Sequence, residues 1–242
     1  MSRQLRAELL KQRSTRTMLF LFLAMIGLVA LASALHVLAP SPAELATRSH
    51  QIEIFEVGTR VGMLFAGLVG AIAITSEIRY GTIRPTFLVT PARGLVVAAK
   101  LAVSGLGGLL FGLLAEGLMA SMTTAALAIR GIPNELETGD YVQLLAGGTG
   151  AAAVWATVGL GIGALVRNQI STLVGLCAWI LLVENLLLLV PAVGRYAPGA
   201  AGLALAGRPD ELSAPAGAFM LILYAALASA GGWLATLRRD VD

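Results

Sequence analysis

Two carboxylates inside long apolar runs are the first candidates for chemistry in this sequence. Glu116 and Glu184 each stand among apolar residues, and a charge in hydrocarbon is costly, so each is by default a candidate functional residue. On a helix that rises 1.5 Å per residue, Glu184 lies about 21 Å beyond Ile170, and Glu116 about 24 Å beyond Lys100. Both therefore fall in the outer third of a hydrocarbon core roughly 30 Å thick.

Two further polar residues stand near the same depth. Arg60 lies near the outer end of an apolar run, where it could pair with one of the carboxylates, and Asn185 could join them. We therefore take Arg60, Glu116, Glu184 and Asn185 as candidates for an outer gate or for the lining of a path through the membrane. The alternative is a structural polar contact between helices, or snorkelling to the outer interface.

Other signatures of chemistry are missing. The sequence contains no G-x-x-x-x-G-K-[ST], H-E-x-x-H or G-x-S-x-G motif. The single cysteine, Cys177, can form no internal disulfide, and His36 and His50 are isolated. We expect no catalytic residue, no metal site and no cofactor bound by this chain. The net charge of +3 is too small to suggest a nucleic-acid partner, and energy for any work would come from another subunit.

The composition defines the elements that must position these residues. Of the 242 residues, 57% are hydrophobic and 13% are charged, and the mean hydropathy is +0.82. An average soluble domain has about 25% charged residues, so a soluble chain of this size is excluded. The apolar runs do not alternate with polar residues and are too long for barrel strands. The fold class is therefore an all-α, polytopic membrane protein.

Six apolar segments are long enough to cross a bilayer, which takes about 20 residues. They are Met18–Leu38, Val57–Ile74, Leu101–Ile129, Val142–Val166, Ile170–Val190 and Ala216–Leu237. The first exceeds the roughly 7–15 apolar residues of a signal peptide, so we expect it to be retained. Twelve of the 17 Lys and Arg residues lie on the side that holds both termini, which predicts that both termini are cytoplasmic.

The cytoplasmic segment 75–100 carries the strongest local pattern, TSEIRYGTIRPTFLVTPARGLVVAAK. Gly81 can end the preceding helix, and Thr82 can cap a new one that Pro91 ends. Ile83 and Phe87 lie one turn apart, so the pattern predicts a short amphipathic helix on the membrane surface. The alternative is an interfacial turn whose arginines face lipid phosphates.

This pattern resembles the first cytoplasmic loop of the type-2 ABC transporter permease family. The residues that carry the resemblance are Glu77, Gly81, Thr82, Ile83, Arg84, Thr90, Pro91, Arg93 and Lys100. The six spans, the basic N-terminal segment and the Pro- and Gly-rich outer segment also fit this family. The resemblance therefore extends over nearly the whole chain.

The resemblance implies one six-span permease domain over residues 1–242. Residues 1–17 would form an amphipathic elbow helix, 75–100 a cytoplasmic coupling loop with a short coupling helix, and 191–215 an extracellular re-entrant segment. The residues implied in coupling to an ATPase are Glu77, Arg79, Gly81, Thr82, Ile83, Arg84, Phe87, Pro91 and Arg93. ATP and magnesium would bind to a separate ABC ATP-binding subunit, and a second permease copy, identical or not, would complete the unit beside membrane lipid.

The expected function is that of the membrane-spanning permease of an ATP-driven exporter in a bacterial-type plasma (inner) membrane. The solute would be hydrophobic or amphipathic, such as a drug, a lipid or a peptide. The chain itself would not be an enzyme. Two alternatives stay open: a non-transporting membrane anchor for a cytosolic partner, and an intramembrane enzyme of lipid metabolism that uses Glu116 and Glu184.

Overall fold

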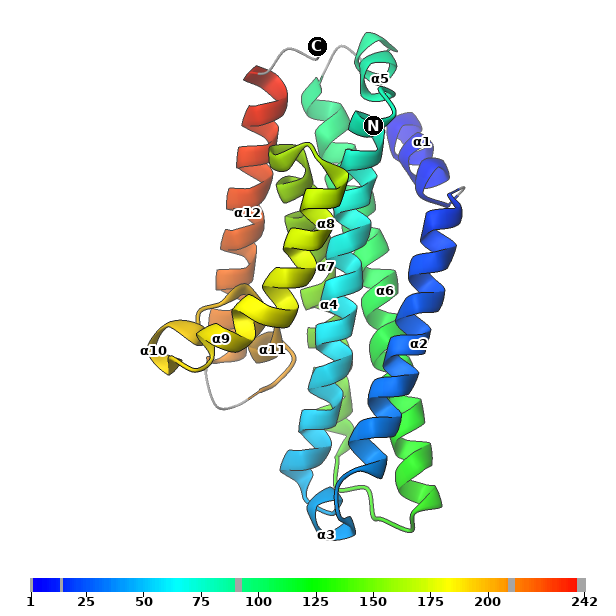
Figure 1. The fold of residues 1–242 in the computed structure, drawn as a ribbon, viewed down its shortest axis with the longest axis vertical. Coiled ribbons are helices and arrows are strands. Elements are labelled where there is room, and N and C mark those ends of the chain that lie inside the picture. Colours follow the sequence, from blue (N-terminus) through cyan, green and yellow to red (C-terminus); the bar gives the residue numbers. More distant parts are fainter. Residues whose placement is uncertain (1, 14, 90–92, 209–211, 239–242) are drawn as a thin grey trace.

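The structure is a bundle of long helices with short helices at its ends (Figure 1). The computed structural model describes residues 2–13, 15–89, 93–208 and 212–238. Every regular element among these residues is helical, and six helices are long and apolar enough to cross a membrane. The prediction of an all-α, multi-pass membrane protein is thus confirmed.

The six spans lie close to the predicted segments. They are α2 (Arg16–Leu38), α4 (Arg48–Arg79), α6 (Arg93–Ile129), α7 (Thr138–Val166), α8 with its continuation η1 and α9 (Gln169–Leu187), and α12 (Ala214–Arg238). The largest difference is in α4, which begins well before the predicted Val57. Its first turns pack against α3 and the start of α7, where Arg48 donates to Asp140.

Five short helices complete the described chain. They are α1 (Ser2–Arg13), α3 (Pro42–Leu45), α5 (Ile83–Val89), α10 (Pro191–Gly194) and α11 (Pro198–Leu205). Helices α1 and α5 lie at one end of the bundle and α3 at the other (Figure 1). We call these the α5 end and the α3 end. Helices α10 and α11 lie beside α9, on the flank of the bundle rather than at its α3 end.

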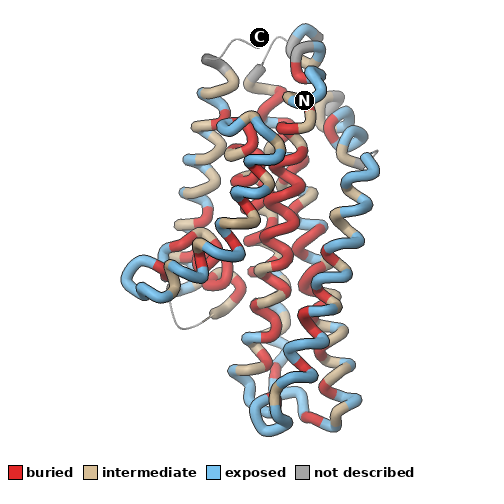
Figure 2. The backbone as a smooth tube through the Cα atoms, viewed as in Figure 1, coloured by how far each residue is buried: buried red, intermediate tan, exposed pale blue. Residues whose placement is uncertain are grey.

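Helix α7 forms the centre of the bundle because its glycines let three neighbours approach. A Cβ on Gly159 would overlap the backbone of Gly67 in α4, and a Cβ on Gly161 would overlap Ala228 in α12. Close approach at small residues is how helices associate in lipid. Figure 2 shows the buried core running along α4, while α2, α8 and α12 turn exposed apolar faces outward.

The predicted break between the second span and the short cytoplasmic helix occurs where expected. Helix α4 ends at Arg79, and Gly81 adopts a left-handed conformation with φ of 68°, which only glycine adopts at little cost. Helix α5 then begins at Ile83, whose side chain is buried against Ile74 and Leu160. This contact fixes α5 to the end of the bundle.

Candidate functional site

Four charged side chains meet where α1 crosses the ends of α4 and α6. The Nζ atom of Lys100 lies 2.7 Å from Glu8 Oε2 and 2.7 Å from Glu77 Oε1. The Nζ atom of Lys11 lies 3.0 Å from Glu8 Oε1 and 2.8 Å from Glu77 Oε1. Glu8, Glu77 and Lys100 are buried, whereas Lys11 is partly exposed. We call these four residues the charge tetrad.

The charge tetrad is electrically balanced, and this balance is what makes its burial tolerable. A buried ion pair stabilises only when geometry is good and both partners are present. Each carboxylate here contacts both ammonium groups. Burial alone would lower the pKa of Lys11, but its hydrogen bonds to Glu77 and Glu8 outweigh that effect and raise the pKa. The tetrad therefore ties α1 to the two spans that flank α5.

Two of the predicted coupling residues, Glu77 and Arg79, point in different directions. Glu77 belongs to the buried tetrad, whereas Arg79 is exposed and donates to Gln169 Oε1 at the start of α8, at 3.2 Å. The Arg79 guanidinium also lies over the Tyr80 ring, 5.5 Å from its centroid. Glu77 thus acts inside the bundle, and Arg79 at its surface.

Helix α5 buries one of its described apolar side chains and exposes another. Ile83 is buried in the bundle, while Leu88 is 81% exposed and Tyr80, just before α5, is 70% exposed. Gly81 and Thr82 are also exposed. Among the side chains that the structure describes here, Leu88 and Tyr80 are the large apolar groups open to a partner. The side chains of Arg84, Phe87 and Arg93, and the whole of Pro91, lie outside what the structure describes.

Glu184 holds the start of α11. Its Oε1 atom accepts hydrogen bonds from the backbone N–H of Gly199, at 2.8 Å, and from the indole N–H of Trp179, at 2.7 Å. The first N–H groups of a helix have no partner within it, so a carboxylate there is favourable. A Cβ on Gly199 would overlap Glu184 Oε2, so the contact requires glycine. Glu184 thus joins the fifth span to the outer segment.

A short π-helix brings Trp179 and Glu184 together. The stretch η1 covers Trp179–Val183, and the backbone N–H of Glu184 donates to the carbonyl of Trp179, five residues earlier. The wider turn of a π-helix places residues i and i+5 on neighbouring faces, which an α-helix does not do. The same two residues are therefore bonded through their backbones and through their side chains.

Glu116 belongs to α6 and lies deep in the bundle, where α6 packs against α4 and α7. Its Oε1 atom accepts from the hydroxyl of Thr59 at 2.5 Å, and a Cβ on Gly148 would overlap the carboxylate. The residue is fully buried, and its Oε2 atom has no hydrogen-bond partner in the described part of the chain. The geometry is that of a polar contact between packed helices.

The residues predicted to form an outer gate or to line a path therefore come together only in part. Arg60 is partly buried and interacts electrostatically with Glu184. Asn185 is exposed and donates to the carbonyl of Leu181 in its own helix, at 2.9 Å. Glu116 bonds to Thr59 instead. Arg60 and Glu184 thus act on each other, whereas Asn185 faces away from Glu184.

Sequence reasoning missed four residues that complete these sites: Glu8, Lys11, Thr59 and Trp179. One signal was available for the first two. Glu8 is the sole acid in the basic segment 1–17, and Lys11 follows it at the i+3 spacing of side chains that meet on a helix. No pattern pointed to Thr59, and the pairing of Trp179 with Glu184 depends on the π-helix.

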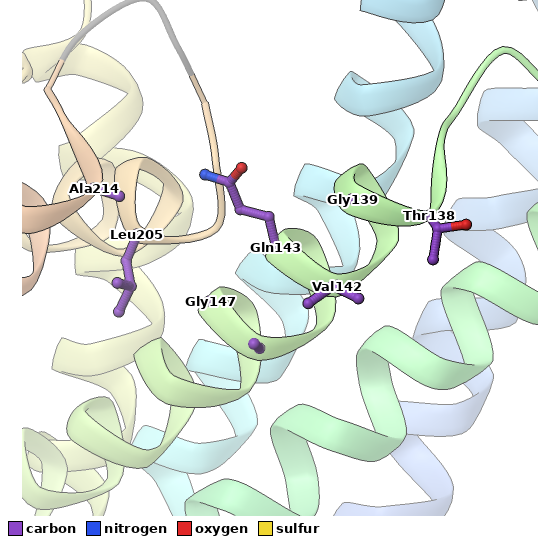
Figure 3. Close-up of a pocket in the computed structure, with 8 residues that line it drawn as sticks. Thr138, Gly139, Val142, Gln143, Gly147, Leu205 and Ala214 are labelled. Carbon is purple, nitrogen blue, oxygen red and sulfur yellow. The ribbon is translucent and has the colours of Figure 1, made fainter.

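One hollow between α7, α11 and α12 carries no candidate chemistry. It measures about 540 Å³ and lies where the first turns of α7 face Leu205 and Ala214 (Figure 3). Gln143 reaches across it toward the α11–α12 connection, and Thr138 stands at its edge. Its lining holds no charged group among the described residues.

Comparison with known proteins adds no family assignment. No protein-family model matches the sequence, and no curated protein matches it.

Proposed function

We propose that this multi-pass membrane protein is the permease subunit of an ATP-driven exporter of a hydrophobic or amphipathic solute. The observation that carries the proposal is helix α5, a short helix between two spans. Ile83 anchors it to the bundle, while Leu88, and Tyr80 just before the helix, are exposed. A surface of this kind suits contact with a cytosolic protein that pushes on the spans. The charge bias of twelve cations to five supports a cytoplasmic α5 end.

In this function the energy comes from a partner subunit that binds ATP and magnesium. The partner contacts Leu88 and Tyr80, and the movement passes through Ile83 into the ends of α4 and α7. The charge tetrad joins α1 to the same unit, because Lys100 stands near the start of α6 and Glu77 near the end of α4. At the outer side, Glu184 and α11 are placed to control release of the solute.

The test is reconstitution of the full-length protein with the ABC ATP-binding subunits of the same genome, one at a time. Leu88→Arg places a charge in the proposed contact and should reduce ATP turnover by the complex about tenfold, equivalent to roughly 1.4 kcal/mol of contact energy. The matched control is Leu38→Arg. Leu38 is 71% exposed and is the last residue of α2, at the α3 end of the bundle.

Three outcomes contradict the proposal. In one, no ATP-binding subunit forms a complex with the protein. In another, Leu88→Arg and Leu38→Arg behave alike, which removes the role of α5. In the third, the complex hydrolyses ATP but moves no hydrophobic dye across the vesicle membrane, which favours the membrane anchor.

A further inference from the structure

An apolar groove of about 610 Å³ lies beside helix α1, where side chains of α1, α2, α4 and α6 face one another. Two leucines from α1 and two from α6 line it, and they are 43–67% exposed: Leu9, Leu10, Leu106 and Leu110. Farther along the bundle α2 and α6 come together, where the rings of Phe22 and Phe111 meet edge to face with centroids 6.2 Å apart. Because its leucines are exposed, the groove opens outward, toward the lipid around the spans.

The position of the groove along the bundle matches the upper part of one leaflet. Helix α1 lies at the α5 end (Figure 1), and Lys100 of the charge tetrad marks the level at which α6 meets it. Leu106 and Phe111 lie about 9 and 17 Å beyond Lys100 on a helix that rises 1.5 Å per residue. The groove therefore occupies roughly the half of the 30 Å hydrocarbon core that adjoins the α5 end.

Two polar side chains of α1 stand at this groove and have atoms free to bind. Arg6 is exposed and Gln12 partly exposed, and both line the groove. Neither side chain has a hydrogen bond or an ion pair among the described residues. Gln12 reaches over α6, with its Oε1 atom 3.3 Å from the position of a Cβ on Gly107. A guanidinium and an amide N–H are donors that suit a phosphate.

The charge tetrad leaves the N-terminal segment with an excess of positive charge. Glu8, the sole acid of residues 1–17, pairs with Lys11 and Lys100. Four cations of the segment lie outside the tetrad: Arg3, Arg6, Arg13 and Arg16. Basic segments at a membrane surface attract anionic lipids, so the charge around the groove favours an anionic headgroup.

The same arrangement disfavours a zwitterionic headgroup. Such a headgroup carries its own ammonium, and no described residue that lines the groove is acidic. The nearby carboxylates of Glu8 and Glu77 are already held by the two lysines of the tetrad. A choline or ethanolamine group would therefore meet arginine without a counter-ion of its own.

We propose that this groove binds an anionic phospholipid, with one acyl chain along α6 and the phosphate on Arg6 and Gln12. The site is independent of the proposed export function, because a membrane anchor with the same α1 would bind the lipid equally well. It is tested on the full-length protein without an ATPase, so its failure leaves the proposed function untouched.

The first experiment measures selectivity for the headgroup. The protein is released from detergent micelles for native mass spectrometry after titration with dioleoylphosphatidylglycerol or dioleoylphosphatidylcholine, which share their acyl chains. Arg6→Gln should weaken binding of the glycerol lipid about fivefold, the effect of one basic residue on an anionic lipid, and leave the choline lipid unchanged. Arg16→Gln is the matched control, because Arg16 is exposed at the start of α2 and lies outside the groove lining.

The second experiment locates the acyl chain. A phosphatidylglycerol with a diazirine in one chain is placed in nanodiscs with the protein, illuminated, and its insertion sites are mapped by mass spectrometry. We expect saturable insertion at Leu106 and Phe111. Leu110→Trp should fill the groove and abolish it. Leu113→Trp should preserve it, since Leu113 is 54% exposed on the same helix but does not line the groove.

Four results would overturn the proposal. Equal binding of the two lipids would remove the role of charge, and equal losses in Arg6→Gln and Arg16→Gln would mean that the lipid responds only to the overall charge of α1 and α2. Insertion that does not saturate, or that is the same in Leu110→Trp and Leu113→Trp, would place the chain in the general lipid around the spans. Displacement of the lipid by excess inorganic phosphate would show that the headgroup binds without the groove.

Discussion

The α5 end of the bundle and the region of Glu116 and Glu184 both bury carboxylates, but they satisfy them in different ways. At the α5 end, Glu8 and Glu77 lie 2.7–3.0 Å from ammonium groups. In the second region, Glu116 and Glu184 accept from neutral donors: a hydroxyl, an indole N–H and a backbone N–H. The first arrangement requires opposite charges in equal number, whereas the second requires only acceptors of the right shape.

This difference predicts how each region responds to substitution. Removing one charge from the tetrad leaves another uncompensated in a buried place, which is strongly destabilising. Replacing Glu116 or Glu184 by glutamine keeps an acceptor oxygen and should cost little stability. The predictions below test this contrast, beginning with the largest expected effect.

Lys100→Met should destabilise the protein most. Lys100 is 2% exposed and contacts both carboxylates of the tetrad, so its loss leaves two acids with one partly exposed ammonium. We expect a loss of about 3–5 kcal/mol in the free energy of unfolding, measured by steric trapping in bicelles.

The control for this effect is the double variant Glu8→Leu with Lys100→Met, which leaves Lys11 paired with Glu77. Although it changes more atoms, it restores the charge balance, and apolar replacement of a buried ion pair is often neutral. It should be more stable than Lys100→Met alone. A double variant that is less stable than the single one would mean that shape, not charge balance, governs the site.

Substitutions at Glu184 should separate acceptor from charge. Glu184→Leu leaves the N–H groups of Trp179 and Gly199 without their acceptor, and the buried N–H of Gly199 alone should cost about 1–3 kcal/mol. Glu184→Gln retains an acceptor oxygen and should unfold close to the unsubstituted protein. The same steric-trapping assay applies, and an equal loss in the two variants would show that the negative charge itself is needed.

Lys11→Met should destabilise the protein less than Lys100→Met, because Lys11 is partly exposed, and its effect should depend on pH. The pKa of Lys11 is raised above its usual 10.5 in the folded protein, so its contribution is full below the unfolded pKa and is lost as pH rises through the folded pKa. The difference in unfolding midpoint between the two proteins should be constant from about pH 8 to 10 and then shrink. A difference that grows above pH 10 would contradict this assignment.

The spans were predictable because an apolar run of sufficient length has few other solutions. Helix α2 ends at the predicted Leu38, α6 at Ile129 and α7 at Val166. The break before α5 was also readable, since Gly81 supplies a conformation that other residues avoid. These features depend on local composition and backbone preference.

The partners within the sites were not readable in the same way. Glu8 and Lys100 are 92 positions apart, and no periodicity reports which helix ends meet in space. The contact of Glu184 with Trp179 depends on η1, and a π-helix has no sequence signal in this apolar run. Counting residues predicts a depth along the membrane, whereas the identity of each hydrogen-bond partner depends on packing.

The tetrad also orders events during biosynthesis. Glu8 leaves the ribosome 92 residues before Lys100, an interval of roughly 5–18 seconds at a synthesis rate of 5–20 residues per second. During that time two spans enter the membrane while α1 cannot yet take its final place. Lys11, three residues from Glu8, is the one tetrad cation already synthesised throughout this interval. Until Lys100 is synthesised, Lys11 is therefore the one tetrad cation with which Glu8 can pair.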